Sequence, residues 1–143
     1  MIVAVHAFTG AALSRLCRTS GQAFALGFAS HLVADAMPHR DLDVPTEGAL
    51  ALAALAAIGL AHGVSSREFA GALGAVAPDL ESAVARTFGI SDEKLLLPTH
   101  SRYHGKKVDN VGGQIALALG CLAILALPTG EESRSRGVEE VRR

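Results

Sequence analysis

The chain has 143 residues, enough for one domain with a hydrophobic core but too few for a separate regulatory module. Half of the residues are hydrophobic, and the mean hydropathy is +0.33. The 13 basic and 14 acidic residues give a formal charge of −1, so the chain lacks the basic excess of a nucleic-acid-binding protein. Cys17 and Cys121 have neither the number nor the spacing of a disulfide framework or a cysteine metal site.

Helical signals dominate the chain up to residue 127. Apolar residues, prolines and glycines predict helices over residues 3–16, 22–37, 47–61, 67–76, 79–88 and 111–127, with a short helix or turn over 91–97 and one helical turn over 100–104. Pro38 and Pro128 end two of these helices, because the residue before a proline is pushed out of the helical region. Pro78 is expected to interrupt the helix that precedes it.

No segment alternates with period two for long enough to predict a strand. We therefore predict an all-α fold, a compact bundle of about five or six helices with a metal site between helices. Residues 1–128 are expected to form this helical metal-binding domain. Residues 129–143 are charged and poor in apolar residues, so we expect a disordered tail.

Two apolar segments bear on membrane association. Residues 48–61 fall short of the roughly 20 apolar residues of a spanning helix, and residues 111–128 only approach that length. The segment 22–37 carries His31 and Asp35, which are costly in lipid unless they face inward. We predict association with the inner or cytoplasmic membrane. The alternative is a cytoplasmic location, because the buried helices of a soluble metalloprotein have a similar composition.

Histidines and carboxylates stand at metal-like spacings in this apolar chain. His31 and Asp35 are four residues apart, which places them on one face of a helix, with about 5–6 Å between Cβ atoms. Pro38 then turns the chain, so that His39 and Asp41 can return to the same space. Polar groups of this kind need a reason to lie inside an apolar protein, and a buried metal ion supplies one.

Three further positions complete the candidate centre. His100 and His104 repeat the four-residue spacing, Asp79 follows a proline, and His6 stands alone in an apolar helix. The predicted metal ligands are His6, His31, Asp35, His39, Asp79, His100 and His104.

The role of Asp41 stays open among a ligand, a residue that orients a ligand histidine, and a plain loop residue. His62 is interpreted as a helix-end residue, and Asp43 and Glu47 as loop or capping residues. Mixed imidazole and carboxylate ligands favour zinc, one to three ions, although manganese and iron also suit such a set.

The run from Gly27 to His39 resembles the Gly-x-x-Ser-His-x-x-x-Asp-x-x-Pro-His signature of small prokaryotic, membrane-associated metal-dependent hydrolases. The resemblance extends over about residues 1–127. It includes an N-terminal histidine (His6), a glycine-rich segment that ends in Pro-Asp (71–79) and a histidine-rich stretch (98–105).

More remotely, the chain is similar to bacterial zinc-dependent phospholipase C and the single-strand-specific zinc nucleases. It lacks the N-terminal Trp and the second His-x-x-x-Glu motif of those enzymes, for which His100 and His104 would have to substitute.

The resemblance implies a metal-dependent hydrolase acting on a phosphoester, either a small molecule or a lipid headgroup at a membrane. Asp35 or Asp79 would be the bridging carboxylate in a centre where metal ions clamp the phosphate and activate water. Arg102, and Arg40 beside His39, would hold phosphate oxygens. Two alternatives remain: a non-catalytic membrane-associated protein with a structural metal, and a metal-free buried hydrogen-bond network.

Overall fold

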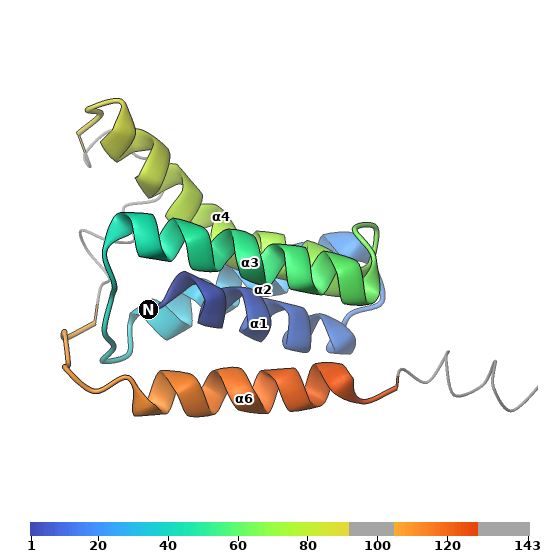
Figure 1. Ribbon diagram of the computed structural model, residues 1–143. Coiled ribbons are helices and arrows are strands. Elements are labelled where there is room, and N and C mark those ends of the chain that lie inside the picture. The colour runs from blue at the N-terminus through green and yellow to red at the C-terminus, as the bar shows by residue number, and fades with distance from the viewer. Residues whose placement is uncertain (92–104, 129–143) are drawn as a thin grey trace, which may run out of the picture.

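Five α-helices and a short 3₁₀ turn occupy residues 1–91 and 105–128, the part of the chain that the computed structural model describes. They are α1 (Val3–Leu13), η1 (Ser14–Leu16), α2 (Ser20–Asp35), α3 (Val44–His62), α4 (Arg67–Thr87) and α6 (Gly112–Ala126). These described residues contain no β-strand, so the predicted all-α bundle is confirmed (Figure 1). The predicted short helix or turn over 91–97 lies, apart from its first residue, outside the described residues, as do the predicted turn over 100–104 and the tail 129–143.

Helix α1 lies at the centre of the bundle. It packs against α2, α3, α4 and α6, and it contains no charged side chain. Small residues on α1, among them Ala7, Gly10 and Ala11, are buried. A helix that is apolar on all sides is stable only when it is surrounded. His6 therefore lies in the most enclosed helix of the fold, where an imidazole requires polar partners.

The chain before α2 and α3 contains the caps that begin these helices. The Thr19 hydroxyl accepts a hydrogen bond from Gln22 N, and the Gln22 side chain accepts one from Thr19 N, so Thr19 caps α2. Asp43 caps α3, and hydrogen bonds from Thr46 lower the pKa of the Asp43 carboxyl. The predicted helices were therefore correct, but they begin two or three residues earlier than expected.

Helix α4 runs without a break through Pro78, so the predicted interruption is wrong. A proline inside a helix removes one backbone donor and costs about 3 kcal/mol in isolation. Here the Pro78 side chain is fully buried, and α4 packs against both α1 and α2. Tertiary packing offsets the local cost, and Asp79 consequently lies within a helix rather than at a helix start. The C-terminal part of α4 extends away from the other helices (Figure 1).

Glycines bring α1, α2 and α4 into backbone contact. A Cβ atom on Gly10 would lie 2.3 Å from Gly71 O, and one on Gly27 would lie 2.0 Å from the same oxygen. One on Gly74 would lie 2.1 Å from Phe24 O. Only glycine fits at such distances. The helices that carry His6, His31 and Asp79 are thus held closer together than side chains would allow.

Helix α6 is fastened to the rest of the bundle at both of its ends. Near its start, Gln114 Oε1 accepts a hydrogen bond from Ile2 N at 2.9 Å. At its end, the Arg15 guanidinium donates to Leu125 O at 2.7 Å and to Leu127 O at 2.9 Å. These carbonyls have no partner within the helix, and a cation suits a helix C-terminus. Polar contacts therefore fix the register of an otherwise apolar helix.

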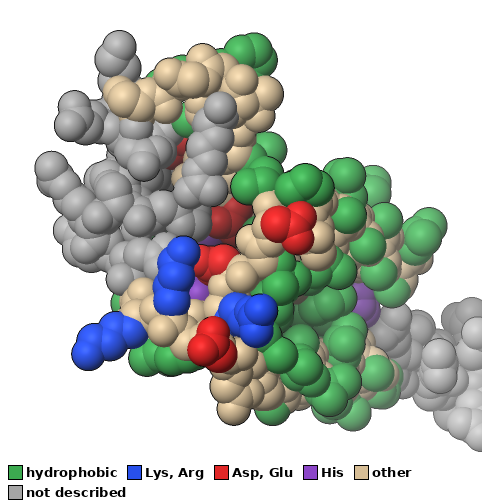
Figure 2. Space-filling view, turned by 60° about the vertical axis from the view of Figure 1, so that its left-hand side comes forward, with side chains coloured by type: hydrophobic (Ala, Val, Ile, Leu, Met, Phe, Trp, Pro, Cys, Tyr) green, Lys and Arg blue, Asp and Glu red, His purple; other side chains and the backbone are tan. Residues whose placement is uncertain are grey.

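Helix α3 presents an apolar surface to the outside. It is 19 residues long, is apolar enough to cross a membrane, and has only 11% of its most apolar window buried. Leu52 and Leu60 are 72% and 89% exposed. Hydrophobic side chains cover much of the face shown in Figure 2, whereas charged side chains gather toward one end of it. The described part of the chain therefore has one helix that is both long enough and apolar enough to cross a membrane, rather than the marginal segments expected from sequence.

Candidate metal centre

Three histidines and an aspartate lie buried where α1 meets the end of α2. His6, His31, Asp35 and His39 have between 0% and 2% of their surface exposed. They are among the largest fully buried side chains in the described chain, in a fold whose core is otherwise mostly alanine. Burial of polar groups without compensation costs several kcal/mol. Their contacts with one another supply that compensation.

Asp35 is the hub of this cluster. Its Oδ1 atom lies 3.0 Å from His6 Nε2, and its Oδ2 atom lies 3.4 Å from His31 Nε2. The α-amino group of Met1 also donates to Oδ1, at 2.8 Å. Burial by itself raises the pKa of the Asp35 carboxyl, but the hydrogen bonds from His31, His6 and the α-amino group outweigh it and lower the pKa below its usual range. Asp35 is therefore ionised, as a metal ligand must be.

A backbone contact shows which ring nitrogen of His31 donates a hydrogen bond. Its Nδ1 atom lies 2.9 Å from Ala75 O. A carbonyl oxygen only accepts hydrogen bonds, so Nδ1 donates to Ala75 O, and Nε2 is the ring nitrogen that faces Asp35. Asp79, one turn after Ala75 on α4, brings its Oδ2 atom to 3.7 Å from His31 Nδ1. The predicted four-residue pairing of His31 with Asp35 is confirmed.

His6, His31 and Asp79 form a group with the geometry of a metal site. Each offers one ligand atom, and the three atoms lie within 4.8 Å of one another. The two imidazole rings are in contact, with their centroids 4.1 Å apart and their planes tilted by 31°. A divalent metal can therefore be held between helices α1, α2 and α4, although this group alone does not identify the ion or the number of ions.

The pKa and the contacts of the His6 imidazole also suit a metal ligand. Burial is the main cause that lowers its pKa, and the nearby His31 adds to the effect, although the hydrogen bond to Asp35 opposes it. Its Nε2 atom contacts Asp35, while its buried Nδ1 atom has no hydrogen-bond partner among the described residues. A neutral imidazole that donates one N–H to a carboxylate leaves its other nitrogen available for a metal. The donor set thus suits zinc or a similar borderline ion.

His39 and Asp41 join the cluster after the turn at Pro38. His39 Nε2 lies 3.0 Å from Asp41 Oδ1 and 3.9 Å from Asp35 Oδ1. Asp41 Oδ1 also accepts a hydrogen bond from the α-amino group of Met1, at 3.1 Å. The expectation that these two residues return to the pocket is confirmed.

A distant segment holds His39 in place, and the sequence did not indicate it. His39 N donates to Lys106 O, and Val108 N donates to His39 O, at 3.2 and 3.0 Å. Gly105 N donates to Asp35 O at 2.6 Å, and a Cβ atom on Gly105 would lie 2.1 Å from Met37 O. The segment 105–108 therefore lies directly against the end of α2.

Glu47 and Gln114 support the centre from outside it. Glu47 accepts hydrogen bonds from Val3 N at 2.7 Å and from Leu42 N at 2.9 Å, so it caps α1 and not its own helix. Gln114 Nε2 donates to Arg40 O at 3.0 Å. An isolated glutamine in an apolar helix was the one available signal for Gln114. Together they fix the first turn of α1 to the loop that carries His39.

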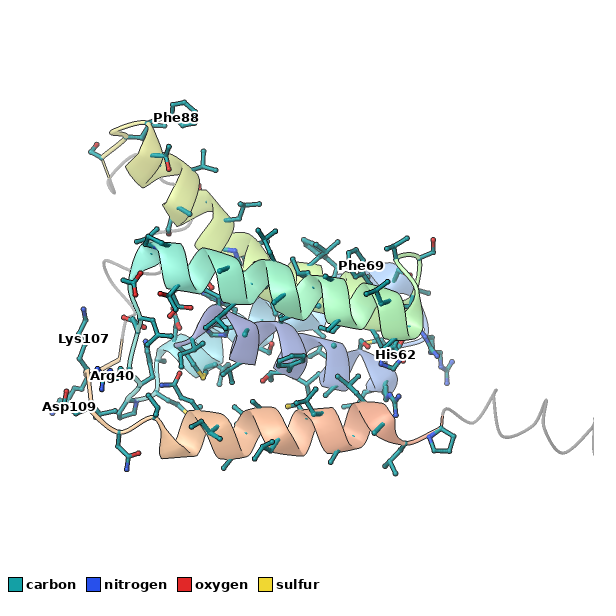
Figure 3. All side chains as sticks on the ribbon, in the orientation of Figure 1. Arg40, His62, Phe69, Phe88, Lys107 and Asp109 are labelled. Atoms are coloured by element: carbon teal, nitrogen blue, oxygen red, sulfur yellow. The ribbon has the colours of Figure 1, made fainter. Side chains whose placement is uncertain are left out.

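The other residues considered from sequence do not lie in the described part of the metal centre. His100, Arg102 and His104 lie outside the described residues, and their assignment stays a prediction. Arg40 donates to Asp109 O at 3.1 Å on the exposed surface at the end of the bundle (Figure 3). His62 is the last residue of α3, at the opposite end of the bundle from Arg40 in the same view.

No family model, curated protein or solved structure matches this chain. The resemblance to metal-dependent hydrolases stays an expectation that rests on the Gly27–His39 motif.

Proposed function

We propose that the chain is a metal-dependent hydrolase in which His6, His31 and Asp79 hold a divalent ion, zinc being the first candidate. The observation that carries the proposal is the convergence of three ligand atoms within 4.8 Å. Two histidines and one carboxylate are a ligand set of catalytic zinc sites, which keep a fourth position open, whereas structural sites are closed by four protein ligands.

Hydrogen-bond acceptors of the chain determine which ring nitrogen of each histidine is left to bind the metal. Asp35 accepts the His6 Nε2 proton and so leaves Nδ1 as the ligand atom. Ala75 O accepts the His31 Nδ1 proton and so leaves Nε2. Contacts of this kind orient metal ligands and strengthen them as donors. When bound, such an ion polarises a phosphoryl oxygen and activates water near neutral pH.

A phosphoester is the substrate class that we propose, either a small molecule or a lipid headgroup. Lys107 forms a β-bridge with His39, and Lys106 is its neighbour, so two exposed cations lie beside the centre. Cations at the mouth of a site favour anionic substrates. The motif resemblance supports the reaction class, and Arg102 is proposed to hold phosphate oxygens together with this pair.

We further propose that the protein associates with the inner or cytoplasmic membrane, in support of a lipid substrate. The exposed apolar surface of α3 and its spanning length favour this location over the cytoplasm. On fractionation of cells, the protein is expected in the membrane pellet and is expected to stay there after an alkaline carbonate wash. Recovery of the folded protein in the soluble fraction without detergent would contradict membrane association.

The alternative function is a structural metal site in a non-catalytic membrane-associated protein. The observation that favours it is burial: His6 and His31 are almost fully enclosed, and Asp79, at 13% exposed, is the most accessible of the three ligands. A site closed to substrate stabilises a fold without catalysing a reaction.

Metal analysis and a hydrolysis assay separate these functions. We expect purified protein to carry about one or more zinc ions per chain, and Asp79→Asn to bind metal at least about 10-fold more weakly. Asp109→Asn is the matched control, because Asp109 is exposed on the loop before α6. Hydrolysis of bis-p-nitrophenyl phosphate is expected in wild type, to be abolished by a chelator and to be restored by zinc.

The outcomes are distinguishable. Absence of stoichiometric metal, with thermal stability unchanged in a strong chelator, would exclude both metal functions. Bound metal without phosphodiester hydrolysis, or equal hydrolysis by wild type and Asp79→Asn, would leave the structural site as the function.

A further inference from the structure

We propose that the Ser82 hydroxyl binds the substrate beside the metal centre, by donating a hydrogen bond to a phosphoryl oxygen of the phosphoester. Ser82 lies on α4, three residues after Asp79. The inference rests on the proposed hydrolase function, and it adds a residue that neither the proposed ligands nor the sequence motifs include.

The Ser82 side chain is a buried polar group without a protein partner. Ser82 is 4% exposed, and its Oγ atom has no hydrogen-bond partner among the residues that the structure describes. Burial removes a hydroxyl from water, so an unpaired one destabilises the folded protein. Such a group in a folded chain needs an explanation, and a ligand that accepts its proton supplies one.

Other helical hydroxyls of this chain use the backbone as their partner. A serine or threonine inside a helix can donate to the carbonyl three or four residues before it. Three residues do so, at oxygen–oxygen distances of 2.6, 2.7 and 2.8 Å: Ser14, Ser30 and Thr87. Ser82 is more deeply buried than Thr87 on the same helix, yet its hydroxyl does not make this bond. Its proton is therefore left for a partner outside the helix.

Ser82 shares the face of α4 that brings Asp79 to the centre. Residues three apart on a helix are neighbours, with about 5–6 Å between their Cβ atoms. Asp79 Oδ2 lies 3.7 Å from His31 Nδ1, and Asp79 is one of the three proposed ligands. Leu80, which lies between Asp79 and Ser82 in sequence, is 62% exposed and belongs to the opposite face. The hydroxyl is thus one turn from the proposed ion.

The Asp79 side of the centre is also the side that a substrate can reach. The Asp79 side chain is 13% exposed, whereas those of His6 and His31 are 1% and 0% exposed. A phosphoester that approaches the ion past Asp79 meets Ser82 on the same helix. A hydroxyl is a hydrogen-bond donor, and its bonds to charged oxygens are stronger than those to neutral ones. Ser82 therefore binds a phosphoryl oxygen on the Asp79 side of the ion.

The test measures inorganic phosphate binding by calorimetry on zinc-loaded, full-length protein. We expect Ser82→Ala to keep the zinc content of wild type and to bind phosphate about 10- to 100-fold more weakly. The kcat/KM for bis-p-nitrophenyl phosphate should fall by a similar factor. Ser82→Thr keeps a hydroxyl and should recover most of both losses. Ser14→Ala is the matched control, because Ser14 is equally buried but its hydroxyl is paired, and it should bind phosphate as wild type does.

Thermal unfolding without phosphate separates a substrate-binding hydroxyl from a structural one. Removal of an unpaired buried hydroxyl should leave the melting temperature of Ser82→Ala unchanged or higher. Removal of a paired one should lower the melting temperature of Ser14→Ala.

Each outcome bears on the proposal. Phosphate binding by Ser82→Ala equal to wild type, a melting temperature lowered as much as in Ser14→Ala, or failure of Ser82→Ala to fold would overturn the role of Ser82. The proposed metal centre would stand in all three cases. Wild type that holds zinc but binds no phosphate would overturn it too, and would favour the structural metal site. Wild type without zinc would refute the proposed function itself, and the role of Ser82 with it.

Discussion

Replacing Asp35 with Asn is expected to weaken metal binding about 10- to 100-fold and to lower the free energy of unfolding by about 3–5 kcal/mol. The substitution keeps the size of the side chain but removes the charge that faces His6, His31 and the α-amino group of Met1. Removal of one partner from a buried charged network leaves the others without compensation, and this is the costly way to break such a network. Urea unfolding of wild type and Asp35→Asn measures the difference.

The destabilisation by Asp35→Asn is expected to depend on pH in one direction. The pKa of Asp35 is lowered in the folded protein relative to its ordinary value of 3.8, so its ionised form stabilises the fold. That contribution is fully present above about pH 4, near the unfolded pKa, and is lost as the pH falls toward the folded pKa. The stability gap between wild type and Asp35→Asn should therefore be constant near neutrality and narrow below about pH 4.

The control for this prediction is Asp109→Asn, which removes a carboxylate from an exposed loop at the same end of the bundle (Figure 3). Surface substitutions away from special contacts change stability by no more than about 0.5 kcal/mol. Equal unfolding midpoints for Asp35→Asn and Asp109→Asn would show that Asp35 is not the hub of a buried network.

Local spacing predicted the part of the centre that lies on one helix. The four-residue separation of His31 and Asp35 fixes their common face without any knowledge of the fold, and Pro38 fixes the turn that returns His39. His6 and Asp79 were predicted as ligands from their side-chain chemistry alone, because a polar residue in an apolar helix needs a polar partner. Which helix supplies that partner depends on tertiary packing, and spacing contains no such information.

The contacts that sequence reasoning missed are long-range or run against local preference. The pairing of His39 with Lys106 and Val108 joins backbone groups about 70 residues apart, and backbone hydrogen bonds leave no trace in side-chain pattern. The interruption expected at Pro78 failed for a related reason. Local propensity favours a break, whereas Pro78 is buried in a helix that packs against α1 and α2, and this tertiary packing outweighs propensity.

Gly27→Ala is expected to weaken both the fold and the metal centre. In an exposed helix this change would stabilise the protein by up to about 1 kcal/mol, because alanine has the higher helix propensity. At Gly27, however, the new Cβ atom would lie 2.0 Å from Gly71 O, a backbone atom of α4 that cannot rotate aside. Overpacking of this kind costs about 1–3 kcal/mol and forces the two helices apart.

The spacing between α2 and α4 at Gly27 also determines the position of His31, one turn further along α2. His31 Nδ1 reaches Ala75 O, at 2.9 Å, only because α2 and α4 are in backbone contact at Gly27 and Gly71. Gly27→Ala should therefore lengthen that hydrogen bond, move His31 away from Asp79 and reduce zinc affinity by about 10-fold or more, although it removes no ligand.

Gly21→Ala is the matched control for Gly27→Ala, since it places the same substitution in the same helix with nothing within 4 Å of the new Cβ atom. We expect Gly21→Ala to be neutral or slightly stabilising and to bind zinc as wild type does. Thermal unfolding and zinc titration of the two variants form the comparison. If Gly27→Ala matches Gly21→Ala in both, the glycine contact does not set the spacing of α2 and α4, and the position of His31 must depend on other contacts.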